Sequence, residues 1–373
     1  MPELQKFFNS ELNRIVKQYN LDPQKIAVAV SGGADSLALA FLMRQYACEF
    51  GSIVVALTVN HNLRAEAKEE AEYVADLMRK CGIEHHILEW KHSKLESGIE
   101  TKAREARYDL LINWCRQNGV GYLLTAHHLR DQAETFLMRL QRGSGVDGLA
   151  AMSDVVERDE VRIVRPLLNI EPQKLRDFLK ERQIAWKEDA SNECDDFLRV
   201  RVRKMLPELE NRLGITIKKI GNAVNALNGA KRYFAVQVSD FIENRCRNWY
   251  GCAWSFNPER FRQLHDEIKI RVIAELIKDI GDENYSPEYE ALERLCNAIS
   301  DDNFKGATLG KCEILKFNRR IWIVPENKSD LVLSKDAWNE YALHNPSILM
   351  HGLPYKLKLN LFEKSCKAVE FNK

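Results

Sequence analysis

The sequence has no long apolar run, no excess of one charge and no closely spaced cysteine pair, and each absence excludes a class of protein. No segment approaches the roughly 18 consecutive apolar residues that a membrane-spanning helix needs, so we expect no membrane contact. The first 20 residues form an amphipathic helical pattern without the continuous apolar core of a signal peptide, which predicts a cytoplasmic protein. The formal net charge of +1 gives no global indication of a nucleic-acid partner.

The nine cysteines are scattered singly through the 373 residues. No C-x-x-C pair occurs, so neither a zinc site nor a disulfide framework is indicated. An odd number of isolated cysteines is typical of reduced thiols in the cytosol. They are Cys48, Cys81, Cys115, Cys194, Cys246, Cys252, Cys296, Cys312 and Cys366.

A glycine turn near the N-terminus is the most informative feature present. The apolar run KIAVAV (25–30) predicts a strand, SGGADS (31–36) follows it, and a helix with an apolar face begins at Asp35. Such a turn presents backbone N–H groups and the positive end of the helix dipole, an arrangement that binds phosphate. No lysine follows the second glycine and no third glycine has Rossmann spacing, which excludes those two nucleotide motifs. A plain strand-to-helix connector is the alternative interpretation.

Strands and helices alternate through the first half of the chain. This alternation predicts an α/β fold with a doubly wound parallel sheet, which we assign to a catalytic domain over residues 1–215. In such a sheet, ligands bind at the carboxyl ends of the strands, near the point where the strand order reverses. The loops after the first, second and fourth strands carry the unusual polar residues. The predicted strands are 25–30, 52–60, 83–90, 121–126 and 161–167.

The pattern changes from about residue 216, and we expect a smaller, mostly helical domain with a C-terminal β element over residues 216–373. Helical periodicity precedes an alternating segment that predicts a hairpin, with its turn near Asn318 and Arg319. A further short strand pattern, YKLKLNL, lies at 355–361.

Two acids and a histidine follow the fourth predicted strand. Asp131 and Glu134 are three residues apart at the start of a predicted helix, so their carboxylates lie on one helix face. This spacing fits a pocket for a cationic amine, although acids in a first helical turn also act as caps that favour the helix dipole. His127 stands just past the strand end, where an imidazole either meets a reacting phosphate or amine or serves a structural role.

Basic side chains gather in two other places. Arg104 and Arg107 lie three residues apart on a predicted helix, where they are either surface charges or bidentate ligands of phosphate or carboxylate. Between residues 199 and 232 there are nine lysines and arginines and two acids. That local excess indicates either a solvated helix face or a stripe that follows a nucleic-acid backbone.

Several motifs, in one order along the chain, carry a resemblance to a known family. The S-G-G-x-D-S turn is similar to the signature of the PP-loop ATP pyrophosphatases, and the whole set resembles the tRNA(Ile)-lysidine synthase family over about residues 25–209. Asn62 stands where that family often has glycine, and asparagine tolerates the positive φ that this position then requires. The motifs are SGGADS (31–36), NHNLR (60–64), ETKAREARY (100–108), AHHLRDQAET (126–135), RGSG (142–145), RPLL (165–168) and EDASN (188–192).

The resemblance implies an ATP-dependent ligase that modifies tRNA. Such enzymes adenylate the C2 carbonyl oxygen of the wobble cytidine in the CAU anticodon of tRNA(Ile). Free L-lysine then displaces AMP and gives lysidine. ATP and Mg²⁺ are the implied cofactors, tRNA(Ile) and lysine are the implied partners, and a homodimer is allowed.

The positions that match the family's motifs imply roles for individual residues. Asp35, Arg107 and His127 would be catalytic, Asp131 and Glu134 would bind lysine, and Asp35 would also hold Mg²⁺. ATP would be bound by Ser31, Gly32, Gly33, Ala34, Asp35 and Ser36. The tRNA would be contacted by Arg199, Arg201, Arg203, Lys204, Lys218 and Lys219.

Two other functions are compatible with a phosphate-binding glycine turn. A PP-loop tRNA thiolase also adenylates a pyrimidine carbonyl, but it needs cysteines for sulfur delivery or an iron–sulfur cluster, and the lack of any C-x-x-C pair argues against it. A non-catalytic ATP-binding module would need neither the two acids after the fourth strand nor the basic stretch.

Overall fold

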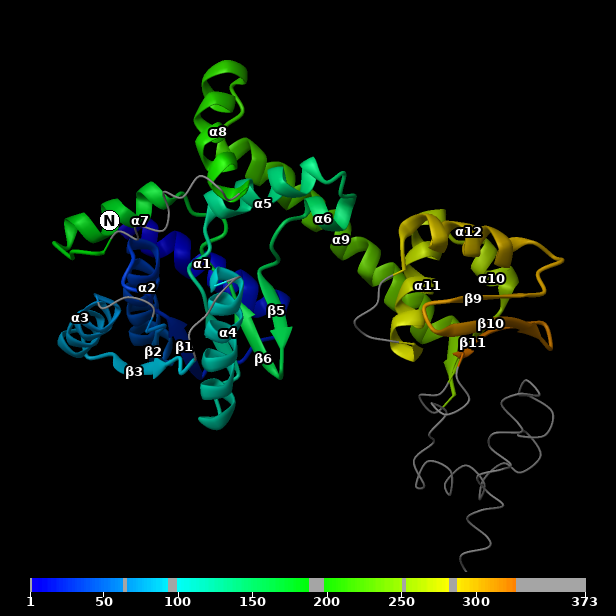
Figure 1. The fold of residues 1–373 in the computed structure, drawn as a ribbon, viewed down its shortest axis with the longest axis horizontal. Helices are drawn as coiled ribbons and strands as arrows, with labels where there is room; N and C mark the ends of the chain where they lie inside the picture. Colours follow the sequence, from blue (N-terminus) through cyan, green and yellow to red (C-terminus); the bar gives the residue numbers. More distant parts are fainter. Residues whose placement is uncertain are drawn as a thin grey trace, which may run out of the picture. The chain divides into compact units, whose positions relative to one another are not determined.

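The computed structural model describes residues 2–62, 66–92, 99–187, 198–249, 253–281 and 287–326. The chain divides into two compact units, Met1–Lys231 and Arg232–Lys373 (Figure 1). The division falls within the long helix α9 (Ile217–Arg245), later in the chain than the domain boundary predicted at residue 215. Residue 215 itself lies between α8 (Leu198–Leu213) and α9.

A six-stranded sheet forms the centre of the first unit, in the order β3-β2-β1-β4-β6-β5. The pairs from β3 to β6 are parallel and the edge strand β5 is antiparallel, which confirms the predicted α/β fold. The strand order reverses between β1 and β4, so the loops after these two strands flank the switch point. The strands are β1 (Lys25–Ala29), β2 (Ile53–Asn60), β3 (Glu84–Glu89), β4 (Tyr122–Leu124), β5 (Val155–Arg158) and β6 (Val161–Val164).

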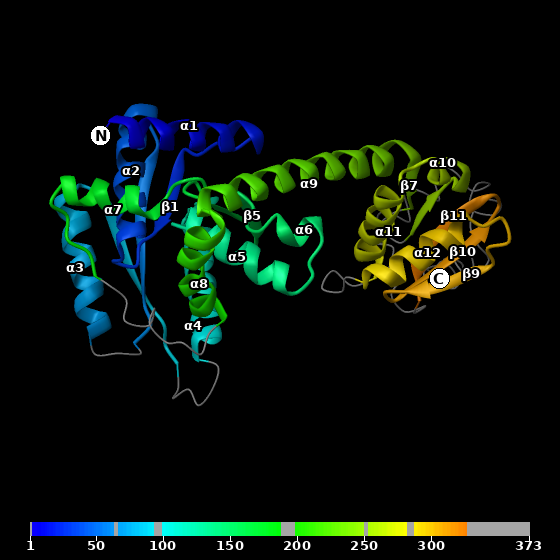
Figure 2. The same ribbon diagram turned by 90° about the horizontal axis from the view of Figure 1, so that it is seen from above.

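Helices cover both faces of this sheet (Figure 2). Side chains alternate along a strand, so Ile26 and Val28 pack on one face with α1, α2, α3 and α7, whereas Ala27 packs on the other face with α4. The apolar side chains of α2 from Leu37 to Met43 lie mostly buried in the larger of these two clusters. The helices are α1 (Pro2–Gln18), α2 (Ala34–Phe50), α3 (Glu66–Lys80), α4 (Ile99–Gln117) and α7 (Pro172–Glu181).

A separate apolar cluster fixes α5 (Leu129–Gln141) against α8 and the first turns of α9. Ala133 of α5 packs with Leu206 of α8 and with Ile220 and Val224 of α9. The short helix α6 (Val146–Leu149) follows α5. This packing brings the basic helix α8 beside the segment that follows β4.

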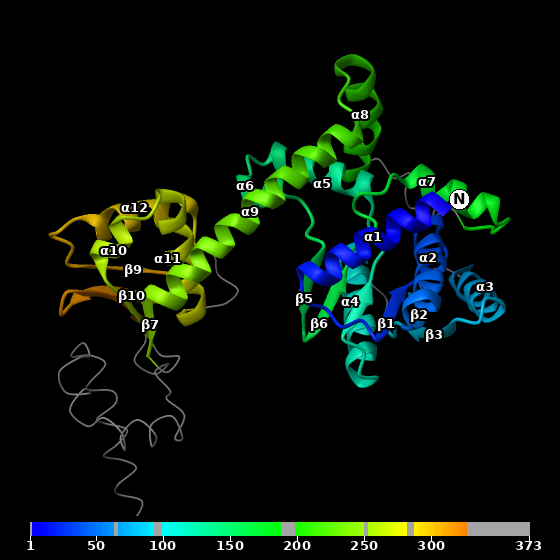
Figure 3. The same cartoon turned by 180° about the vertical axis from the view of Figure 1, so that it is seen from behind.

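The second unit contains a five-stranded antiparallel sheet in the order β7-β8-β11-β10-β9, with α11 and α12 packed against it (Figure 3). The predicted hairpin is confirmed as β10 and β11, and Asn318 (φ 50°) and Arg319 (φ 57°) form its turn. The strands β7, β8 and β9 were not predicted from the sequence, and the pattern at 355–361 lies outside the described residues. The elements are β7 (Cys246–Asn248), β8 (Trp254–Phe256), α10 (Pro258–Arg262), α11 (Asp266–Ile280), α12 (Tyr289–Ser300), β9 (Gly306–Leu309), β10 (Cys312–Phe317) and β11 (Arg320–Pro325).

Two of the predicted absences can be compared with the described residues. None of the helices in the described ranges has both the length and the apolar character that a membrane crossing requires. The cysteines recorded within these ranges are free: Cys48, Cys81, Cys115, Cys246, Cys296 and Cys312.

Candidate active site

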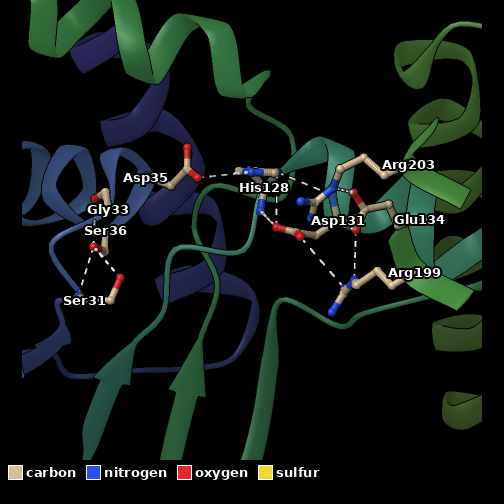
Figure 4. Close-up of polar contacts among 9 residues, drawn as sticks. All are labelled: Ser31, Gly33, Asp35, Ser36, His128, Asp131, Glu134, Arg199 and Arg203. Atoms are coloured by element: carbon tan, nitrogen blue, oxygen red, sulfur yellow. Dashed lines mark hydrogen bonds and ion pairs between the residues drawn. The ribbon is translucent and has the colours of Figure 1, made fainter. Parts of the chain in front are cut away.

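The glycine turn lies where β1 ends and α2 begins, as predicted. Gly32 has φ 86°, a conformation that side chains disfavour, and a Cβ there would lie 3.2 Å from Val74 Cγ2. The buried hydroxyl of Ser36 donates to the Gly33 carbonyl oxygen at 3.0 Å and accepts the Ser31 N–H at 3.1 Å (Figure 4). Ser36 therefore stabilises the turn in which it lies.

The helix α2 begins without a side-chain cap. Its N-cap residue, Gly33, has an extended backbone and offers no side-chain acceptor. The N–H groups of the first turn are left for a ligand, and they lie at the positive end of the helix dipole. This end of α2 is therefore suited to bind phosphate.

A buried histidine joins the glycine turn to the predicted amine pocket. His128 is 8% exposed and is the N-cap of α5. Its Nε2 lies 3.4 Å from Oδ2 of Asp35, and its Nδ1 lies 3.1 Å from Oδ2 of Asp131 (Figure 4). Asp131 accepts the His128 backbone N–H at 3.0 Å, which completes a capping box. From the sequence we selected His127 and missed this neighbour, although its N-cap position three residues before an acid was a usable signal.

Electrostatic interactions stabilise the arrangement of Asp35, His128 and Asp131. Burial would lower the pKa of His128, but the hydrogen bond to Asp35 and the charges of Asp131 and Asp35 raise it above its ordinary value. Burial would raise the pKa of Asp131, but the ring and the backbone of His128 hold it below its ordinary value. Both directions favour a proton on the ring. A proton on Nε2 is donated toward Asp35, whereas a proton on Nδ1 would exchange the capping bond from the Asp131 backbone N–H, at 3.4 Å, for one to the Asp131 carboxylate.

Asp35 has one carboxylate oxygen available for a cation. Its Oδ2 faces His128, whereas its Oδ1 is buried and has no hydrogen-bond partner among the described residues. Mg²⁺ is usually held by one or two carboxylates together with substrate phosphates and water. No cluster of three or more His, Cys, Asp or Glu side chains suited to a metal occurs in the described ranges. The residues therefore fit a Mg²⁺ ion that arrives with a nucleotide.

Glu134 is completely buried and is paired with two arginines of α8. Its Oε2 accepts the Arg199 Nε–H at 2.9 Å, and its Oε1 accepts the Arg203 Nε–H at 2.8 Å. The hydrogen bond from Arg203 to Glu134 raises the pKa of that guanidinium. Nη2 of Arg199 also lies 3.9 Å from Oδ1 of Asp131. Two arginines that we assigned to tRNA from the sequence thus lie inside the site, with the acids assigned to lysine (Figure 4).

Comparison with known proteins identifies the family of this chain. Residues 4–209 match the PP-loop domain family. The chain is 36% identical over 329 residues to a tRNA(Ile)-lysidine synthase of Wolbachia pipientis wMel, covering 87% of this chain and 75% of that relative. It is also 36% identical to a tRNA(Ile)-lysidine synthase of Ruegeria pomeroyi, covering 85% of this chain and 75% of that relative. The chain belongs to the tRNA(Ile)-lysidine synthase family.

A solved structure is similar to this lysidine synthase family member in fold alone. The U34-tRNA thiolase NcsA from Methanococcus maripaludis, with its [4Fe-4S] cluster, has a TM-score of 0.52 and 20% sequence identity. The likeness covers 61% of this chain and 78% of the thiolase chain.

His127 is a neutral histidine among arginines. Burial lowers its pKa to about 4, against the effect of Asp131, and the charges of Arg165, Arg104 and Arg199 lower it further. Its Nδ1 lies 3.0 Å from the Thr125 hydroxyl. The three arginines come from β6, α4 and α8 or from loops next to them, so three positive charges surround His127 in this lysidine synthase family member.

Arg165, which follows β6, was not predicted. It donates to the Ser153 carbonyl oxygen at 2.9 Å, but its Nε is buried without a hydrogen-bond partner among the described residues. Burial lowers the pKa of Arg165, whereas the hydrogen bond with Tyr108 and the charge of Asp154 raise it, and this half-buried positive charge also acts on His127. The sequence placed Arg165 inside the predicted strand 161–167, whereas the structure ends that strand at Val164.

Arg107 is exposed on α4 and contacts a different histidine. Its Nε–H donates to Nε2 of His61, at the carboxyl end of β2, at 3.2 Å. Burial and the charge of Arg107 lower the pKa of His61 to about 4, so the ring is a neutral acceptor. Asn62 has φ 52°, as its match to a glycine position predicted, whereas Arg64 lies outside the described residues.

The remaining basic residues assigned to tRNA lie on the surface. Arg201 and Lys204 are exposed on α8, and Lys218 and Lys219 are exposed on α9. Lys219 also donates from Nζ to the Gly214 carbonyl oxygen at 2.8 Å. The six residues assigned to tRNA therefore separate into an inward pair, Arg199 and Arg203, and these four outward residues.

Proposed function

We propose that this protein ligates free L-lysine to C2 of the wobble cytidine in the CAU anticodon of tRNA(Ile). The reaction consumes ATP and yields lysidine, AMP and pyrophosphate in the cytoplasm. The observation that carries the proposal is the direct contact, through His128, between the nucleotide turn and the acid Asp131. A phosphate-binding turn and an anionic amine pocket at one switch point support a two-step adenylation and amine transfer.

In the first step the cytidine O2 attacks the α-phosphorus of ATP. The new O–P bond replaces the bond to the β-phosphate, and pyrophosphate leaves. The turn at residues 31–36 and the open N-terminus of α2 would bind the phosphates. Oδ1 of Asp35 would hold Mg²⁺, which neutralises charge on the leaving pyrophosphate.

In the second step an amino group of lysine attacks C2. A C–N bond forms, the C2–O bond breaks, AMP leaves with that oxygen, and the attacking nitrogen releases a proton to the solvent. Asp131 would bind the amine, while the Arg199 guanidinium, held by Glu134, offers its remaining N–H groups to the lysine carboxylate. Arg165, Arg104 and neutral His127 would surround the phosphate of the adenylate, and Arg107 would contribute to the same positive region. Positioning and charge stabilisation then supply most of the rate acceleration.

The assay that tests the proposal measures pyrophosphate release from Mg·ATP with a CAU-anticodon tRNA, with and without lysine. We expect release to require the tRNA, and mass analysis of the nucleoside to show the addition of lysine only when lysine is present. A tRNA that differs only in its wobble base is the matched control. Pyrophosphate release independent of tRNA, or sulfur in the product, would overturn the proposal in favour of an ATP-binding module or a thiolase.

A further inference from the structure

We infer that His128 is a positioning residue with two separable tasks, one at each ring nitrogen. Its Nε2 end holds Asp35 for the adenylation step, and its Nδ1 end holds Asp131 and the start of α5 for the lysine step. The inference rests on the proposed function and adds a link between its two half-reactions.

The Nε2 end restrains a carboxylate that is otherwise free to turn away. The Asp35 side chain is 33% exposed, and Oδ2 is held by His128 at 3.4 Å. With Oδ2 held, Oδ1 remains in its buried, unpartnered position instead of rotating to solvent. A donor restrained in this way is positioned for the nucleotide before the nucleotide arrives.

The Nδ1 end organises the amine pocket. Oδ2 of Asp131 faces the ring at 3.1 Å and accepts the His128 backbone N–H at 3.0 Å, which leaves Oδ1 on the side of Arg199. The first turn of α5 and the direction of Asp131 therefore depend on the same ring. Because the ring joins the loops after β1 and β4, it connects the two sides of the switch point.

Two amide side chains reproduce the two ends of the ring separately. Asparagine places a polar atom near the Nδ1 position but does not reach Asp35. Glutamine reaches the Nε2 position but leaves the capping position empty. Both side chains are uncharged. A difference between the two variants therefore depends on which ring nitrogen the amide replaces, and not on the loss of charge.

The test compares His128→Asn with His128→Gln in the full chain. We expect His128→Asn to weaken binding of Mg·ATP about tenfold by calorimetry and to slow tRNA-dependent pyrophosphate release at least as much, with KM for lysine within about twofold of wild type. We expect His128→Gln to keep Mg·ATP affinity within about threefold, to raise KM for lysine about tenfold, and to lower Tm by about 2–4 °C because a helix cap is lost. Parallel losses in the two variants would overturn the inference, because a merely structural histidine predicts them.

His85→Asn is the matched control. His85 is a half-buried histidine on β3 whose Nε2 lies 2.8 Å from the Thr58 hydroxyl. Its replacement is expected to alter Tm while leaving the ratio of Mg·ATP affinity to KM for lysine unchanged. A change in that ratio as large as the one in the His128 variants would count against the positioning role of His128.

A double-mutant cycle keeps the inference testable should the glutamine variant not fold. If His128 acts through Asp35, His128→Asn combined with Asp35→Asn binds Mg·ATP no more weakly than Asp35→Asn alone. Additive losses overturn the inference. A wild-type protein that binds Mg·ATP but releases no pyrophosphate with tRNA overturns the proposed function instead, and the Mg·ATP affinities of the variants still decide the role of His128.

Discussion

At the scale of single residues, the site depends on charges that are buried together. Glu134 has no exposed surface, and both of its oxygens are occupied by arginines that are themselves about one-third exposed. Removing one partner of such a group leaves the other charges without compensation, which costs far more than breaking an exposed pair. Glu134 therefore contributes to stability as well as to the pocket.

We expect Glu134→Gln to lower the free energy of unfolding by about 1–3 kcal/mol, because Arg199 and Arg203 lose their anionic partner. In the pyrophosphate-release assay, this variant should retain tRNA-dependent release and show a raised KM for lysine. Glu208→Gln on α8 is the control: it removes an exposed pair to Arg212 at 3.7 Å and should change the unfolding free energy by less than about 0.5 kcal/mol. Equal destabilisation by the two changes, in urea denaturation, would contradict the assignment.

His127 predicts a pH dependence of stability. The pKa of this residue in the folded protein, about 4, lies below the ordinary histidine value of 6.5, so the unfolded chain takes up a proton first as the pH falls. The free energy of unfolding should therefore be unaffected by His127 above about pH 6.5 and should decrease between about pH 6.5 and pH 4, with a slope of up to about 1.4 kcal/mol per pH unit.

Denaturation of the wild type and His127→Gln at a series of pH values measures this effect. His61 and His85, whose pKa values burial also lowers to about 4, contribute in the same direction in both proteins. The difference between the two curves therefore isolates His127. Curves that stay parallel from pH 7 to pH 4 would show that the ring is not held neutral.

At the scale of helices, two N-termini at the switch point have opposite designs. The start of α2 has no side-chain cap, and its N–H groups stay available, whereas the start of α5 is closed by the His128–Asp131 capping box. The uncapped N-terminus of α2 can bind a ligand, whereas the capped N-terminus of α5 is held in one position. The helix α9 supports that position, because Gly221 lies against Leu129, the first residue of α5.

We expect Gly221→Ala to destabilise the first unit. A Cβ at this position would overlap Cδ1 of Leu129, which is buried, so the Leu129 side chain must shift within its packed surroundings. Overpacking of this kind costs about 1–3 kcal/mol, and the gain in helix propensity offsets about 1 kcal/mol of it. Asn222→Ala, at the next and exposed position of α9, gains propensity without the overlap and should be neutral or stabilising. Thermal unfolding and KM for lysine are the measurements, and a stabilised Gly221→Ala protein with unchanged KM would show that Leu129 does not hold α5 against α9.

At the scale of the whole molecule, the charge is nearly balanced, with 55 basic and 54 acidic residues. Association with tRNA must therefore depend on where the basic residues lie. The outward residues Arg201, Lys204, Lys218 and Lys219 belong to two helices that α5 packs against, so they lie on elements that adjoin the site. Such a local positive surface orients a polyanion without a large net charge.

We expect the double reversal Arg201→Glu with Lys218→Glu to weaken tRNA binding at least tenfold at low salt. The slope of log affinity against log salt should become shallower by about 0.7–0.9 for each tRNA phosphate that the variant no longer neutralises. Lys80→Glu with Lys180→Glu changes the net charge equally at exposed positions of α3 and α7 and is the control. Filter binding over a salt series would contradict the assignment if the two double variants gave the same slope.

Local sequence signals determined much of the molecule. The glycine turn, the alternating strands and helices, and the hairpin at Asn318 and Arg319 could be predicted because each depends on neighbouring residues and on their periodicity. The positions of Asp35, Asp131 and Glu134 at helix starts followed from the same signals. β5 and the short strands β7, β8 and β9 were missed because three or four residues carry too little periodicity by themselves. The equally short β4 and β6 were predicted because they lie in the longer apolar runs 121–126 and 161–167.

Only the tertiary structure decided how the site residues pair. Glu134 meets Arg199 and Arg203 because α5 packs on α8, and residues more than sixty positions apart come into contact. His128 reaches Asp35 because the strand order places β4 next to β1, which no local pattern in either segment reveals. The residue types and their local conformations therefore follow from the sequence, whereas their partners, burial and charge states depend on how the sheet is ordered and how its helices pack.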